Sequence, residues 1–229
     1  NGKALVAGDT LKNPDLAVTL KSLAKNGLED FYRGGLGKAL GQFFESWNGV
    51  LTQSDFSRYS ADEVTPLQFD ISKGRLFNLP PPTQGLVSLL ILAIYDELYH
   101  DDMDELESTH LIIEASKQAF LIRDQYICDP IGMSVSSAEL LSKKNVKKLA
   151  KKISKKALDW PCQSEPGDTI WMGCIDQDGL MVSFIQSIYW EFGSAVVIPG
   201  TGIVWNNRGL SFSLKQSHHN SVSPHKKPL

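Results

Sequence analysis

The sequence predicts an α+β protein, with helices in its first two thirds and strands toward its end. Apolar residues recur at helical spacing before residue 158, and two segments with strand character flank a turn after residue 168. Of the 229 residues, 42% are hydrophobic and 21% are charged, which supplies a packed core and excludes general disorder. The net charge of -3 gives no whole-chain reason to expect nucleic acid or an anionic membrane as a partner.

The first elements are predicted to be helices. Asn13-Pro14 has the residue types of a helix N-cap and first turn, and Asn26-Gly27 is a stop signal. A second helix is expected over residues 29–47. Thr52 and Asp55 then form a capping pair that opens a short helical turn.

The middle of the chain is predicted to be a hairpin followed by two long helices. Residues 65–71 alternate apolar and polar side chains, turn through Lys73-Gly74, and resume as residues 75–79. Apolar helices are expected over residues 86–100 and 106–126. The longest apolar run, residues 86–95, is far shorter than the roughly 20 residues needed to span a bilayer, so no membrane insertion is expected.

Residues 138–157 predict one amphipathic helix with a lysine stripe. Leucine, valine and isoleucine occupy the opposite side, so the stripe is interpreted as a solvated face. Binding of nucleic acid or acidic lipid is a remote alternative, because no aromatic residues interleave with the lysines. The stripe consists of Lys143, Lys144, Lys147, Lys148, Lys151, Lys152, Lys155 and Lys156.

Residues 159–168 have the composition of a linker, and a β-hairpin is expected after them. Residues 169–175 and 180–188 are the two strands, and residues 176–179 the turn between them. The polar tail, residues 215–229, is expected to be solvated, and its neighbouring histidines to bind no metal. Cys128, Cys162 and Cys174 lack metal-ligand spacing and are expected to be small buried side chains.

The residues alone single out no catalytic group. There is no Ser-His-Asp spacing, P-loop or dinucleotide fingerprint. Thr169 begins a strand directly after Pro166-Gly167-Asp168, where a backbone turn could strain the Asp168–Thr169 peptide bond. Threonine is also a common strand residue. On this evidence a structural role and a catalytic role for Thr169 both stay open.

A resemblance to a known family covers essentially the whole chain. The ordered set of segments resembles the γ-glutamyltranspeptidases, which are N-terminal nucleophile hydrolases, and is most similar to the γ-glutamyltranspeptidase-like and cephalosporin-acylase-like branch. The segments are residues 7–17, 27–34, 51–55, 80–85, 119–124, 129–130, 168–176, 192–194, 200–203 and 206–207.

The resemblance implies a fold and a self-processing mechanism. The fold is the four-layer αββα sandwich, with residues 1–168 as the end of a large subunit and residues 169–229 as the start of a small subunit, interleaved in one domain. The precursor cuts itself between Asp168 and Thr169, and Thr169 becomes the catalytic nucleophile, with its own α-amine as base. No cofactor and no metal are implied. The partners implied are the two subunits, possible homodimers of them, and a small γ-glutamyl or other acyl amide with water, an amino acid or a peptide as acceptor.

Three further site residues follow from the resemblance. Ser187 lies where the family has a second threonine that hydrogen-bonds the nucleophile. Tyr189 lies where glutathione-cleaving members have an asparagine that contacts the substrate carboxylate, and Ser211 where they have an aspartate that pairs with the substrate ammonium. These departures, with Ile170 in place of a threonine or serine, leave γ-glutamyl specificity open.

The sequence also predicts that the chain is an internal portion of a longer precursor. It opens on Asn1 without methionine, and the family's substrate-binding arginine and oxyanion-hole glycines would lie outside residues 1–229. The chain by itself is therefore expected to have weak activity or none. The alternative is a non-catalytic relative that keeps the fold, and the sequence leaves the cellular location open between cytoplasm and export.

Overall fold

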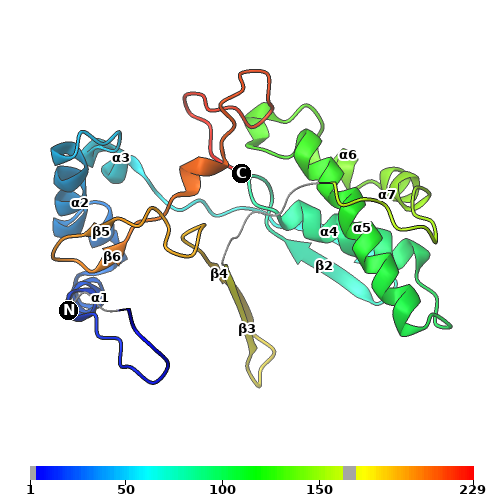
Figure 1. Cartoon of the computed structure of the whole chain (residues 1–229), viewed down its shortest axis with the longest axis horizontal. Helices are drawn as coiled ribbons and strands as arrows, with labels where there is room; N and C mark the ends of the chain where they lie inside the picture. Colours follow the sequence, from blue (N-terminus) through cyan, green and yellow to red (C-terminus); the bar gives the residue numbers. More distant parts are fainter. Residues whose placement is uncertain (1–3, 162–168) are drawn as a thin grey trace. The chain divides into compact units, whose positions relative to one another are not determined.

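The computed structural model describes residues 4–161 and 169–229, and it divides into two compact units (Figure 1). Unit 1 combines residues 1–62 with residues 166–207, and unit 2 combines residues 63–165 with residues 208–229. Both units contain helices and antiparallel strands, so the predicted α+β class is confirmed. In the described part of the chain, no helix is both long and apolar enough to cross a membrane.

The helices of unit 1 begin with α1, Pro14–Asn26, which Asn13 caps by accepting a hydrogen bond from the Leu16 amide. The prediction of one helix over residues 29–47 is wrong, because the chain forms a short 3-10 helix, Leu28–Phe31, and then α2, Gly35–Ser46. The break falls at Gly34, where any side chain would overlap Asp30. Helix α3, Gln53–Arg58, begins with the predicted Thr52–Asp55 capping box.

The strands of unit 1 form two antiparallel pairs. Strand β3, Ile170–Ile175, pairs with β4, Met181–Gln186, and β5, Val197–Ile198, pairs with β6, Ile203–Val204. The small core of this unit joins α2, α3 and β5 through Leu40, Phe56 and Ile198, with Phe44 and Trp205 packed against them. Residues from before and after the undescribed residues 162–168 therefore share one core.

Two hydrogen bonds fasten α1 to the turn between β5 and β6. Thr19 Oγ1 donates to the Thr201 carbonyl at 2.8 Å, and Asn13 Nδ2 donates to the Gly202 carbonyl at 3.1 Å. Gly202 has a φ of +65°, and an added Cβ would overlap Asn13 and the Leu16 backbone. Glycine is therefore required at this close approach.

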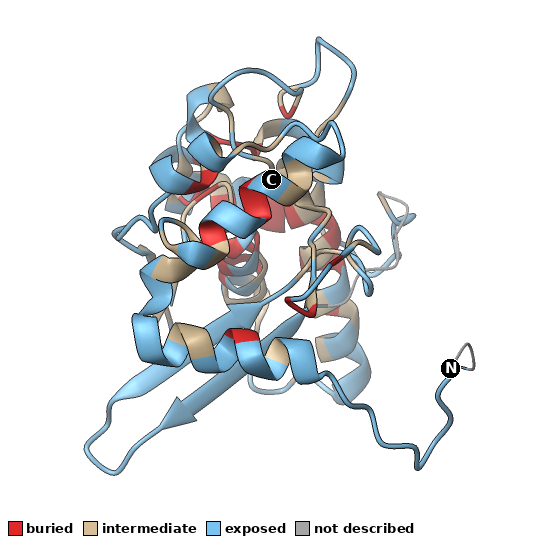
Figure 2. Ribbon diagram, turned by 90° about the vertical axis from the view of Figure 1, so that its left-hand side faces the viewer, coloured by how far each residue is buried: buried red, intermediate tan, exposed pale blue. Residues whose placement is uncertain are grey.

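Unit 2 is built around α4, Gly85–Leu98, which contacts β1, β2, α5 and α7. Strands β1, Leu67–Ile71, and β2, Gly74–Asn78, form the predicted hairpin, and α5 runs over Glu105–Tyr126. The buried residues, drawn in red in Figure 2, lie mostly on helices. The main core consists of Leu86, Val87, Leu89, Leu90, Ala93, Ile94, Ala115, Ala119, Ile127, Leu140, Leu141, Val146, Leu149 and Ala150.

The prediction of one helix over residues 138–157 is wrong in extent. The segment forms α6, Ser137–Leu140, and α7, Lys143–Ala150, because the Ser142 side chain caps α7 by accepting from the Asn145 amide. Its amphipathic pattern is correct, since Val146 and Leu149 are buried and all eight lysines are exposed. Residues 151–161 contain no helix or strand.

The C-terminal tail is folded back onto unit 2, in contrast to the solvated tail that was expected. The His219 Nε2 lies 3.1 Å from the Ile127 carbonyl oxygen, and the Lys227 amide donates to Asp129 at 2.8 Å. Asn220 is 3% exposed. The polar tail packs here because its nitrogen donors form hydrogen bonds with a backbone carbonyl and a carboxylate just after α5. The hydropathy of the sequence does not reveal such pairs.

The expectation that the cysteines are buried holds for one of the two that the structure describes. Cys128 is buried, but Cys174 on β3 is exposed. Cys162 lies outside the described residues.

Candidate active site

Thr169 and Ser187 face each other at the open end of the β3–β4 hairpin. The register pairs Ile170 with Gln186, so Thr169 and Ser187 are the next opposed positions. The Thr169 hydroxyl donates a hydrogen bond to Ser187 Oγ at 2.9 Å. Both residues are exposed, so the Thr169 hydroxyl is held by one defined partner and is open to a reactant.

The chain bends sharply directly after Ser187. Tyr189 has a φ of 81°, a conformation that costs on the order of 1 kcal/mol for a residue other than glycine. The Tyr189 amide donates to Ser187 Oγ at 2.9 Å, so this oxygen receives two hydrogen bonds. Asn207 supports the bend, because its side chain accepts from the Trp190 amide and its own amide donates to the Ile188 carbonyl.

A cavity of about 540 Å³ within unit 1 has Ser187 in its wall. The lining is mostly aromatic and aliphatic and comes from α3, β6 and the loops around them. Such a mixture of an apolar wall and a few polar groups is typical of small-molecule sites. The lining residues are Phe31, Tyr32, Leu51, Asp55, Phe56, Tyr59, Ser187, Ile188, Ile203, Val204, Trp205 and Asn206.

The acidic residue in this lining, Asp55, is already bonded to neighbouring residues. The Thr52 hydroxyl and amide both donate to Asp55, and these bonds hold the pKa of the Asp55 carboxyl below its usual value. Arg58 also bonds Asp55 at 3.0 Å. In the same lining, burial raises the pKa of the Tyr32 hydroxyl, so this tyrosine stays protonated at neutral pH. Asp55 is therefore a fixed negative charge in the lining and no proton donor.

The predicted site residues fall into three groups. Thr169, Ser187 and Tyr189 are brought together by the hairpin and the bend that follows it. Ser211 belongs to unit 2, where its carbonyl accepts from Asn220 and its buried Oγ has no hydrogen-bond partner among the described residues. Asp168 lies outside the described residues.

The sequence did not reveal the aromatic wall or the role of Asn207. Trp205 lies more than 100 residues from Phe31 and Phe56 in the sequence, and no local pattern links it to them. Asn207 had a usable signal, because asparagine outside helices and strands commonly bonds nearby backbone groups.

A family model described as gamma-glutamyltranspeptidase matches residues 1–229. The chain therefore belongs to the γ-glutamyltranspeptidase family, as the ordered motifs predicted.

Several known members of the family are similar to this chain over nearly its whole length. The oxamate amidohydrolase proenzyme of Klebsiella pneumoniae is 46% identical over 229 residues, which cover all of this chain and 43% of that protein. A glutathione hydrolase-like proenzyme of Bacillus subtilis is 35% identical over 230 residues, covering 99% of this chain and 43% of that protein. The crystal structure of a cephalosporin acylase from Bacillus halodurans matches 99% of this chain and 42% of its own, with 40% identity and a TM-score of 0.86.

The likeness to the cephalosporin acylase confirms the expected N-terminal nucleophile hydrolase fold. This chain spans about 43% of the length of the curated relatives that it matches. The candidate site therefore lies in a portion of a fold that is longer in those relatives.

Proposed function

We propose that this chain belongs to a self-processing amidohydrolase or acyltransferase that uses Thr169 as its nucleophile. The observation that carries the proposal is the hydrogen bond from the Thr169 hydroxyl to Ser187 at the end of the hairpin. Family membership supports it, because relatives include hydrolases described as proenzymes. Large and small subunits would then arise from one precursor, cut between Asp168 and Thr169.

The first reaction is the cleavage of the chain itself. Thr169 Oγ attacks the carbonyl carbon of Asp168, the C–N bond breaks, and the nitrogen takes up the hydroxyl proton. The acyl group of Asp168 is then an ester on Thr169 Oγ. Water hydrolyses this ester and leaves a carboxylate at residue 168 and a free amine and hydroxyl at Thr169.

The second reaction is substrate turnover. The new α-amine has an unperturbed pKa of about 7.7–8.0, so it can accept the hydroxyl proton near neutral pH, which an amide cannot do. Thr169 Oγ attacks the substrate amide, the amine leaves, and an acyl-enzyme forms. Water, an amino acid or a peptide then takes the acyl group. The bond to Ser187 would orient the hydroxyl in both reactions.

We propose a small acyl amide as the substrate, with γ-glutamyl compounds as one class. Tyr189, whose amide donates to Ser187 Oγ, would contact the acyl group. Ser211 has no charge to offer a substrate ammonium, and a hydrogen bond to a charged group typically contributes about 1.5–3 kcal/mol. The second class consists of small amides that carry a carboxylate but no ammonium group. It is suggested by the 46% identity to an oxamate amidohydrolase.

The test uses the full-length protein and its Thr169→Ala variant. Mass spectrometry is expected to find a fragment that begins at Thr169 in the wild type and none in the variant. The processed enzyme is then assayed with a γ-glutamyl anilide, a glutaryl amide and oxamate. A single intact chain after prolonged incubation contradicts self-processing.

The alternative is a non-catalytic relative, favoured by Ile170, Tyr189 and Ser211. It predicts no turnover of any of the three substrates even after cleavage. Turnover of one substrate that is abolished in Thr169→Ala rejects this alternative.

A further inference from the structure

Residues 140–158 concentrate positive charge in a chain that is otherwise acidic. They include eight lysines and neither aspartate nor glutamate, so their formal charge is +8. The rest of the chain has the other 15 of the 23 lysines and arginines against all 26 aspartates and glutamates, a net charge of -11. Such a separation of charge attracts anions to one part of the surface.

A cavity of about 370 Å³ in unit 2 has three of these lysines in its wall, and we name it the lysine cavity. Lys144 and Lys148 lie about 6 Å apart along the axis of α7, and Lys152 follows two residues after the helix ends. Gln125 and Glu139 add an amide and a carboxylate to the wall. The three ammonium groups outweigh the carboxylate, so the wall has a net positive charge. The volume lies within the range of small-molecule sites.

The three ammonium groups are left without a carboxylate partner among the described residues. No ion pair there involves Lys144, Lys148 or Lys152, or the carboxylate of Glu139 in the same wall. The neighbouring Lys147, by contrast, pairs with Glu97 at 3.8 Å. Like charges one helical turn apart repel each other, so a bound anion would relieve this repulsion.

Contacts with the core hold α7 in one orientation. Val146 and Leu149 are buried in the main core of unit 2. Asn145 Nδ2 also donates to the Leu140 carbonyl at 2.7 Å. The backbone that carries the cavity lysines is therefore fixed before a ligand binds, which lowers the entropic cost of binding. Because its apolar side chains are used in the core, α7 cannot insert them into a lipid bilayer.

Solubility alone does not explain this arrangement. A solvated helix face is most stable when lysines alternate with carboxylates, because opposite charges four residues apart attract and like charges repel. Residues 140–158 contain no carboxylate side chain, and three of their lysines line a cavity. Lysine binds a phosphate group as a compact point charge, and several lysines in succession suit several phosphate groups.

We propose that the lysine cavity binds a small soluble molecule that carries two or more phosphate groups. Lys144, Lys148 and Lys152 would neutralise its charge, and the Gln125 amide would donate a further hydrogen bond. Glu139 would repel the anionic groups, so these would lie along the lysines. The cavity lies within unit 2, and the proposal does not depend on the chemistry of Thr169.

The test uses isothermal titration calorimetry of the full-length protein with tripolyphosphate and with inorganic phosphate, at low and at physiological ionic strength. The cavity variant replaces the three wall lysines and is Lys144→Gln/Lys148→Gln/Lys152→Gln. The matched control removes the same charge from exposed lysines outside the wall and is Lys151→Gln/Lys155→Gln/Lys156→Gln. Thermal melts check that each protein is folded.

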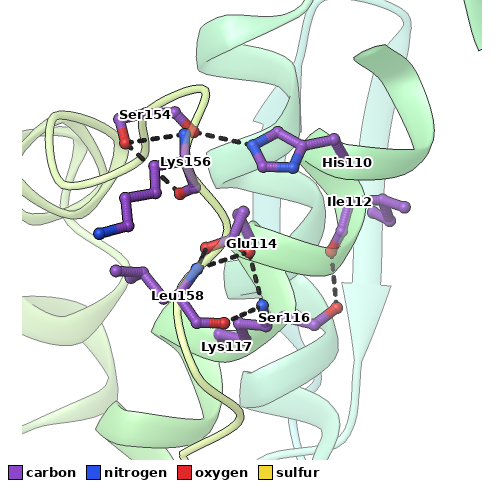
Figure 3. Close-up of polar contacts among 8 residues, drawn as sticks. All are labelled: His110, Ile112, Glu114, Ser116, Lys117, Ser154, Lys156 and Leu158. Carbon is purple, nitrogen blue, oxygen red and sulfur yellow. Dashed lines mark hydrogen bonds and ion pairs between the residues drawn. The ribbon is translucent and has the colours of Figure 1, made fainter. Parts of the chain in front are cut away.

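The control lysines follow the end of α7, where the chain is bonded to α5. In Figure 3 the His110 Nε2 lies 2.8 Å from the Ser154 carbonyl oxygen, and Lys117 Nζ donates to the Leu158 carbonyl at 2.5 Å. The Lys156 ammonium group takes part in none of the bonds among the residues drawn. The control should therefore lose charge without a change in the path of the chain.

The proposal expects saturable binding of tripolyphosphate that weakens at higher ionic strength, because salt screens exposed charges. Three exposed charge pairs together change affinity by about tenfold, so the cavity variant should bind about tenfold more weakly and the control within about twofold of the wild type. Inorganic phosphate should bind more weakly than tripolyphosphate. If the cavity variant does not fold, Lys148→Gln and Lys155→Gln are compared in the same way.

Three results would overturn the proposal. The first is a wild-type protein without saturable binding, and the second is an equal loss of affinity in both triple variants. The third is equal affinity for tripolyphosphate and inorganic phosphate. Vesicles that contain phosphatidylserine distinguish a lipid surface from a soluble ligand, since sedimentation with them in the absence of tripolyphosphate binding would assign the lysines to a membrane surface instead.

Discussion

Replacing Ser187 with alanine tests the geometry of the candidate site most directly. The change removes one oxygen, which accepts hydrogen bonds from the Thr169 hydroxyl and the Tyr189 amide, both at 2.9 Å. A hydrogen bond between neutral groups contributes about 0.5–1.5 kcal/mol, which corresponds to about 2- to 13-fold in rate. Because Thr169 and Ser187 are exposed, water can replace the lost partner, and the lower half of this range is expected.

The assay follows formation of the fragment that begins at Thr169 in the full-length protein. Ser187→Thr keeps the oxygen and should process at close to the wild-type rate. Ser183→Ala is the matched control, because Ser183 Oγ also accepts a 2.9 Å hydrogen bond on the same hairpin, from Trp171 Nε1. An unchanged rate in Ser187→Ala would refute the orienting role. An equal loss in Ser183→Ala would show that the effect comes from the hairpin as a whole.

Three further changes probe the two units. Gly202→Ala should lower the free energy of unfolding by about 2–3 kcal/mol, because alanine is strained at a positive φ and its Cβ would displace the Asn13 side chain that caps α1. An unchanged midpoint of chemical denaturation would contradict this. Burial lowers the pKa of His219, so as the pH falls below about 6.5 the unfolded chain binds a proton before the folded protein does. The contribution of His219 to stability should therefore be kept above that pH and lost as the pH falls toward the folded-state pKa. In thermal melts, His219→Gln should flatten this pH dependence of the unfolding midpoint. Iodoacetamide should label exposed Cys174 in the native protein much faster than Cys128, whose thiol pKa is raised by burial, and equal labelling would contradict the structure.

Local patterns in the sequence predicted the features that depend on neighbouring residues. The strand patterns around residues 176–179 predicted the β3–β4 hairpin, whereas the pairing of Thr169 with Ser187 was expected only from the family resemblance. The observed register, with Ile175 opposite Met181, brings these two positions face to face. The caps at Asn13 and Thr52 also follow from their own residue types.

Features that depend on distant residues were not predictable in this way. The lysine-rich segment has a helical pattern over 20 residues, but the Ser142 cap interrupts it. Glu114 and Lys117 on α5 bond the Leu158 backbone, where the chain after this segment follows an irregular path. The C-terminal tail is polar, yet it binds the end of α5 through His219 and Lys227. Except for the local Ser142 cap, the deciding partners are far away in the sequence, where periodicity carries no information.

The positions of these distant contacts bear on what the proposed cut would do. In unit 1, Asn13 and Thr19 from before residue 168 hold the Thr201-Gly202 turn from after it. In unit 2, the end of α5 binds residues 219 and 227. Each unit is therefore packed from both sides of the proposed cleavage point. Breaking the peptide bond at Thr169 would free an amine and a carboxylate but would break none of these contacts, so the nucleophile would stay on the scaffold that positions it.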